Sequence, residues 1–206
     1  MPSRVPAAEV LALFNEGVDA FCAEAARLDD AGWARLACGE WTATQLARHV
    51  LSVIGWYHDW LNRAEAGDAS PAFPIEELDQ HTARSLEQIG DMAGPDATER
   101  FRERAVLYAG RLVDHWNLPY GYPRGTVTAG LHAGVAAVEW HAHTWDLARS
   151  NGRDHVPSRP DRLFLAAADC QAAVAGGLKG AALDKLAPLG ARREPWRELL
   201  KRLGRA

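Results

Sequence analysis

The pattern of apolar positions along this chain is helical almost from end to end. Near the N-terminus, apolar side chains recur with a period of about 3.6 residues, which predicts the buried face of an amphipathic helix: Val10, Leu11, Phe14, Val18 and Phe21. The same pattern, broken by glycine, proline and asparagine, predicts seven helices: residues 5–27, 42–66, 75–92, 97–116, 128–150, 160–178 and 195–203. No strand-like alternation of useful length occurs. We therefore expect an all-α protein.

Local signals define some of the helix boundaries. Thr42 is an N-capping residue in front of the second helix, and Asn151-Gly152 is suited to end the helix that starts near residue 128. The Gly94-Pro95-Asp96 break leaves two alternatives open, namely two helices or one that continues after a kink. We expect a four-helix bundle within a single domain spanning residues 1–206, in which a C-terminal extension of about 153–206 adds further helices.

Composition narrows the class of protein. The 206 residues are 48% hydrophobic and 24% charged, with a net charge of -4 and a pI of about 6.1. A nucleic-acid-binding protein would typically have a basic surface and a high pI, so this class is not indicated. No apolar run approaches the ~20 residues of a membrane span. The three cysteines form no CxxC pair, so we expect reduced thiols and a cytoplasmic location. A basic C-terminal cluster is interpreted as the solvated face of the last helix: Arg192, Arg193, Arg197, Lys201, Arg202 and Arg205.

The most specific chemistry lies in the helix over residues 128–150. Glu139 and His143 are four residues apart, so their side chains leave one helical face one turn apart. Their small and apolar neighbours indicate a buried helix, where a carboxylate needs a partner. The pair fits either a simple hydrogen bond or two ligands of a divalent metal. In the second case His49, on the second helix, would complete a His2Glu set with an open fourth position.

Other residues near this pair have different expected roles. His132 shares the face of Glu139 but lies ~10 Å away along the helix, which suits a substrate contact, the alternative being a histidine near solvent at the helix start. His141 points away from the pair and is excluded as a ligand. None of the cysteines is an obvious nucleophile, and Cys38, in the connector before His49, is the best candidate among them.

Two segments resemble a known family. Residues 33–49, WARLACGEWTATQLARH, are similar to the start of the DinB-like superfamily in its branch of mycothiol-dependent maleylpyruvate isomerases. The match includes a Trp-Thr helix start and a histidine eight residues after Trp41. Residues 118–121, LPYG, followed by residues 139–152, EWHAHTWDLARSNG, resemble the second signature of that branch. The resemblance extends over nearly the whole chain, including its ending at residues 200–205.

The resemblance implies a DinB-type bundle in which His49, Glu139 and His143 bind a divalent metal. Zinc is the first expectation, with nickel and iron(II) as alternatives. The implied chemistry is activation of a small thiol, mycothiol or bacillithiol, for S-transfer to, or cis–trans isomerisation of, a small electrophile. Asp146 would orient His143 or make a purely structural contact. Relatives are expected to use arginines near the pocket, and Arg84 is the candidate by position.

Further alternatives stay open. A His2Glu set also suits a non-haem iron(II) protein of the same fold. A non-enzymatic protein that binds metal in stress or sequestration is another reading. We expect small-molecule partners rather than nucleic acid or a membrane, and pairing of bundle edges would give a homodimer.

Overall fold

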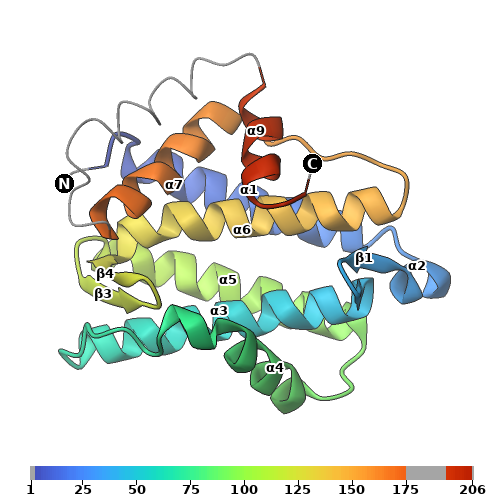
Figure 1. Ribbon diagram of the computed structural model, residues 1–206, viewed down its shortest axis with the longest axis horizontal. Coiled ribbons are helices and arrows are strands. Elements are labelled where there is room, and N and C mark those ends of the chain that lie inside the picture. Colours follow the sequence, from blue (N-terminus) through green and yellow to red (C-terminus); the bar gives the residue numbers. More distant parts are fainter. Residues whose placement is uncertain (1–2, 175–193, 206) are drawn as a thin grey trace.

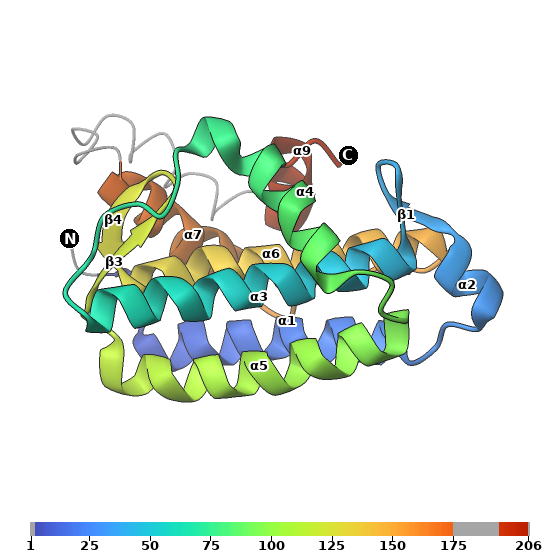
Figure 2. The same cartoon turned by 90° about the horizontal axis from the view of Figure 1, so that it is seen from below.

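Four long helices form the core of the structure: α1 (Ala7–Ala25), α3 (Ala43–Glu65), α5 (Gly94–His115) and α6 (Ala129–Ser150). The structure is a computed structural model that describes residues 3–174 and 194–205. The four helices lie side by side, α1 packing mainly against α6 and α3 against α5 (Figure 1). As Figure 2 shows, α3 and α5 run in the opposite direction to α1 and α6. A long connection therefore crosses the bundle between α3 and α5.

Shorter elements complete the fold. The long connection contains the 3-10 helix η1 (Ile75–Glu77) and α4 (Leu78–Ile89), which lies across α3 (Figure 2). The remaining helices and strands are α2 (Asp30–Ala34), α7 (Pro160–Val174), α9 (Pro195–Arg202), β1 (Leu36–Cys38), β2 (Trp41–Thr42), β3 (Pro119–Tyr122) and β4 (Gly125–Thr128). The strands form two antiparallel hairpins, which lie at opposite ends of the bundle (Figure 1). Within the described residues, no helix has both the length and the apolar character needed to cross a membrane.

The all-α class expected from the periodicity is confirmed. Of the two alternatives for this region, two separate helices is the one observed, but the break lies at Gly90, which has a positive φ of 65°; Gly94-Pro95-Asp96, where it was expected, forms the first turn of α5. The two hairpins were not expected, since strands of two to four residues are too short to show an alternating pattern. The final part of the expected helix over 160–178, and Arg192 and Arg193 of the basic cluster, lie outside the described residues.

Two threonine caps set the register of the helices that carry the candidate site. The Thr42 hydroxyl accepts a hydrogen bond from the Gln45 backbone N–H, and the Gln45 side chain accepts one from the Thr42 N–H, which forms a capping box at the start of α3. The Thr128 hydroxyl accepts from the Leu131 N–H at the start of α6. Each cap is the last residue of a hairpin strand, so each hairpin leads directly into the next helix.

Close packing of α6 against α7 makes Gly134 sensitive to substitution. A Cβ atom at Gly134 would lie 2.7 Å from the backbone of Ala166, whereas one at Gly110, an exposed position on α5, would meet nothing within 4 Å. We expect Gly134→Ala to lower the free energy of unfolding by about 1–3 kcal/mol through overpacking. Gly110→Ala should raise it by up to about 1 kcal/mol through helix propensity. Urea unfolding of both variants tests this, and equal effects at the two positions would contradict it.

Candidate metal centre

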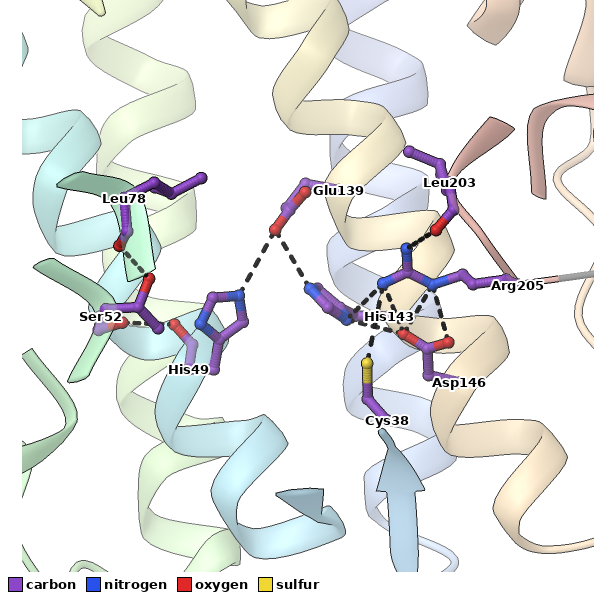
Figure 3. A network of polar contacts seen from close by, with 10 residues as sticks. Cys38, His49, Ser52, Leu78, Glu139, His143, Asp146, Leu203 and Arg205 are labelled. Carbon is purple, nitrogen blue, oxygen red and sulfur yellow. Dashed lines mark hydrogen bonds and ion pairs between the residues drawn. The ribbon is translucent and has the colours of Figure 1, made fainter. Parts of the chain in front are cut away.

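Three side chains from facing helices converge on one point. His49 comes from α3, and Glu139 and His143 come from successive turns of α6 (Figure 3). Glu139 Oε1 lies 3.5 Å from His49 Nε2 and 3.1 Å from His143 Nε2. The side chains of His49 and His143 are 9% and 5% exposed, whereas that of Glu139 is 35% exposed. The structure thus brings the three expected ligand residues together.

The donor set fits a divalent cation. In a tetrahedral zinc site with ligands at about 2.0–2.1 Å, neighbouring ligand atoms are about 3.3 Å apart. The two measured separations, 3.1 and 3.5 Å, lie on either side of that value. Ligand atoms of all three residues lie within 4.8 Å of one another. Trp41 packs against the His49 ring with centroids 4.7 Å apart, which holds this imidazole in position.

Asp146 and Arg205 support His143 from behind. Asp146 Oδ2 lies 2.9 Å from His143 Nδ1, so this nitrogen is the protonated donor and Nε2 is directed toward Glu139. Arg205 donates to both oxygens of Asp146, each at 2.8 Å (Figure 3). A carboxylate on the outer nitrogen of a histidine is the usual way to orient a metal ligand. Asp146 is therefore in a position to orient the His143 ring, as expected from the sequence.

Arg205 corrects part of the interpretation of the basic C-terminal cluster. Its side chain is only 18% exposed and points into the site rather than into solvent. The reason is that α9 ends at Arg202 and the chain then turns at Gly204, which has a positive φ of 72°. The C-terminal segment thereby contributes a charged group about 60 positions away from its partner Asp146. A helical pattern has no signal for such a contact.

Opposite charges on Glu139 and His143 stabilise each other and shift the pKa values of both groups. Burial disfavours the charged form of His143, but the charge of Glu139 and hydrogen bonds with Asp146, Cys38 and Glu139 raise its pKa well above the usual value. Burial likewise opposes ionisation of Glu139, yet the charge and hydrogen bonds of the two histidines hold the pKa of its carboxyl well below the usual value. Burial dominates for His49 and lowers its pKa. The metal-free site therefore carries its proton on His143.

The three converging residues open onto a cavity of about 900 Å³. This lies within the range of about 300–1,000 Å³ that is typical of small-molecule sites. The walls come mainly from α3, α4, α6 and the β3–β4 hairpin. Cys38, Trp41 and Arg205 line the end with the candidate ligands, and the other end is lined by aromatic residues and His132. The cavity thus offers space for a ligand beside the three donors.

Other residues singled out in the sequence occupy different places. His132 lines the cavity and is 1% exposed, so the alternative of a solvent-near histidine is wrong. Arg84 is exposed on α4, whose cavity face consists of other residues, so it does not contact the site; Arg124 and Arg205 are the arginines of the lining. His141 faces away, with its ring nitrogens 2.9 Å from His155 Nε2 and 3.1 Å from the Leu13 carbonyl oxygen.

Cys38 is the cysteine nearest to the candidate ligands. Its sulfur lies 3.9 Å from Arg205 Nη2, and together with His143 and Asp146 it forms a second group of closely spaced donor atoms. Asp146 in that group is already held by Arg205, which makes the His49 group the better metal site. All three cysteines are free. Cys22 and Cys170 do not line the cavity, and burial raises the pKa of the Cys22 thiol to about 11 and that of Cys170 to about 12.

Fold and site together define a helical-bundle protein with a candidate His2Glu metal centre between α3 and α6. Residues 14–148 match the family model of the mycothiol maleylpyruvate isomerase N-terminal domain, and the chain belongs to this family. The match confirms the resemblance seen in the two sequence segments. It includes all three candidate ligand residues and Asp146, and it ends before the C-terminal extension that carries Arg205.

Solved structures with the same fold include two crystal structures of a mycothiol-dependent maleylpyruvate isomerase. The first is 20% identical with a TM-score of 0.56, and the match covers 71% of this chain and 63% of that one. The second, a histidine-to-alanine mutant, is 18% identical with a TM-score of 0.55, and the match covers 82% of this chain and 71% of that one. At these identities the similarity establishes the fold. None of the curated proteins matches the chain significantly.

Proposed function

We propose that this protein is a divalent-metal-dependent enzyme that activates a small thiol of the mycothiol type, for S-transfer to or isomerisation of a small electrophile. The observation that carries the proposal is the convergence of His49, Glu139 and His143 on the wall of a 900 Å³ cavity. Three protein donors leave one position of a tetrahedral zinc ion for a ligand. Membership in the mycothiol maleylpyruvate isomerase N-terminal domain family supports the choice of thiol.

Each residue of the site has a defined part in this proposal. A divalent cation held at this site would favour the thiolate form of a small thiol over the neutral thiol, which would make the nucleophilic form available at neutral pH. His49, Glu139 and His143 would hold that cation, and the contact of Asp146 with Nδ1 would direct Nε2 of His143 toward it. Arg205, at the same end of the cavity, donates to both oxygens of Asp146 and helps to keep this carboxylate ionised beside His143. Trp41 packs against the His49 ring and lines the same end of the cavity.

Metal analysis followed by calorimetric titration tests the proposal. We expect about one zinc ion per chain, and mycothiol binding at least about tenfold tighter to the zinc-loaded protein than to the metal-free protein. Glutathione should bind more weakly than mycothiol. Zinc without thiol binding would favour a non-enzymatic metal-binding protein, and redox-active iron with oxygen consumption would favour a non-haem iron protein; either result overturns the proposal.

Proton release should accompany zinc binding. The raised pKa of His143 means that its imidazolium must lose a proton before Nε2 can bind a metal, whereas His49 has a lowered pKa and Glu139 is already ionised. We therefore expect about one proton to be released per zinc ion near neutral pH, and the apparent affinity to weaken as pH falls. Calorimetry in buffers with different ionisation enthalpies measures this number. A release of zero protons at pH 6 would contradict the assignment.

A further inference from the structure

Aromatic rings form the end of the cavity that lies away from the candidate ligands. Trp56, Tyr57 and Trp60 of α3, Tyr122 of β3 and His132 of α6 line this aromatic end. The His132 ring centroid lies 4.6 Å from that of Tyr57, 5.2 Å from Tyr122 and 5.7 Å from Trp60. Flat apolar walls of this kind suit a flat ligand, because ring faces and edges pack favourably on one another.

Two polar groups in this end of the cavity lack a hydrogen-bond partner among the described residues, namely the His132 ring and the Tyr122 hydroxyl. His132 is 1% exposed, and its Nδ1 is buried without a hydrogen bond among the described residues. The nearby hydroxyl groups of Tyr108 and Tyr120, in contrast, are hydrogen-bonded to each other. Buried polar groups normally have partners, and an unpaired one in a cavity wall points to an atom of a ligand.

Charged residues of the cavity lie elsewhere. Asp79 and Arg124 are exposed at the rim, and Arg205 lies beside the candidate ligands. Burial lowers the pKa of His132 to about 3, so its ring is neutral. An anion beside His132 would lose its hydration, and the charge that acts on His132 is the negative one of Glu139; Arg124, whose charge reaches the Tyr122 hydroxyl, is exposed. The ring faces can attract a cation, but Glu139, the carboxylate that acts on His132, already interacts with two histidines and Asp79 is exposed at the rim, so no free carboxylate is available to neutralise a cation beside His132.

We infer that the aromatic end binds the second substrate, and that this electrophile is a planar, uncharged, aromatic or conjugated compound whose polar atom hydrogen-bonds to His132. The identity of the ligand as second substrate rests on the proposed function, in which the other end takes the thiol; the binding site itself does not. Glu139 follows His132 by seven positions in α6, which is about 10 Å along the helix. This spacing leaves room for one ring next to a thiol.

Three isosteric probes test the charge of the ligand on the zinc-loaded full chain. Benzamide is neutral, benzoate is an anion and benzamidine is a cation, and all three are planar and unreactive. We expect benzamide to bind about tenfold more tightly than either charged probe and than the non-planar cyclohexanecarboxamide. Its addition should shift the NMR resonances of the His132 ring. Equal or tighter binding of benzoate or benzamidine, or an absence of benzamide binding, overturns the inference.

The variant His132→Phe keeps an aromatic ring and removes the hydrogen bond. Its affinity for benzamide should fall about tenfold, while zinc stoichiometry and mycothiol affinity stay unchanged. His115→Phe, on α5 and outside the cavity lining, is the matched control and should bind benzamide normally. Undiminished affinity in His132→Phe overturns the inference. If zinc or mycothiol fails to bind while the preference for benzamide holds, the proposed function fails and the aromatic site stands.

Discussion

Alanine at His49, Glu139 or His143 is expected to abolish zinc binding while leaving the helical content largely intact. Each residue supplies one of three donors, and two donors hold zinc far more weakly than three. The backbone of α3 and α6 does not depend on them, because both helices begin at threonine caps and carry many buried apolar side chains. Metal analysis of the purified variants and circular dichroism measure the two outcomes.

A matched control separates this site from surface histidines. His115 on α5 also contacts a carboxylate, with its Nε2 3.0 Å from Glu65, but it does not line the cavity. His115→Ala should therefore keep about one zinc ion per chain. A stoichiometry that stays at about one after any two of the three site changes would show that the metal centre is wrongly placed. Glu139→Gln, which keeps the shape and removes the charge, should lose zinc as Glu139→Ala does.

The second large effect is expected at Asp146. Asp146→Asn should weaken zinc binding by about 10- to 100-fold, because the amide no longer offers a charged acceptor to His143 Nδ1. It also leaves Arg205, which is largely buried, without its counter-charge. Loss of one partner of a buried ion pair typically lowers the free energy of unfolding by about 3–5 kcal/mol. Titration against a chromophoric chelator and urea unfolding measure the two effects.

Arg205→Met distinguishes the two roles of Asp146. This change removes the ion pair but leaves the contact between Asp146 and His143 in place. It should reduce stability by an amount similar to that of Asp146→Asn, with a clearly smaller loss of zinc affinity. The double variant should be less destabilised than the sum of the single changes, since both remove one interaction. Unchanged zinc affinity in Asp146→Asn would reduce its role to structural support.

Much of this protein could be predicted from local patterns. The 3.6-residue period of apolar positions predicts the long helices because each must bury one face. The i,i+4 spacing places Glu139 and His143 on the same face of one helix, one turn apart. Thr42 sets where α3 begins, two turns before His49. These are properties of single helices, so they are present in the sequence itself. The sequence itself does not decide whether Glu139 and His143 form a simple hydrogen-bonded pair or bind a metal.

Contacts between elements far apart in the chain were decided by the tertiary structure alone. The turn after α9 carries Arg205 from an apparently solvated basic face to Asp146, and α4 presents a face that leaves Arg84 in solvent. The aromatic end forms only when α3, α6 and a short hairpin meet, with His132 among them. Sequence alone determined the helical elements and the pairing of residues within α6, because spacing along one helix is fixed by its geometry. The packing of the helices decided which side chains line the same cavity. The periodicity of apolar positions within one helix carries no information about this packing.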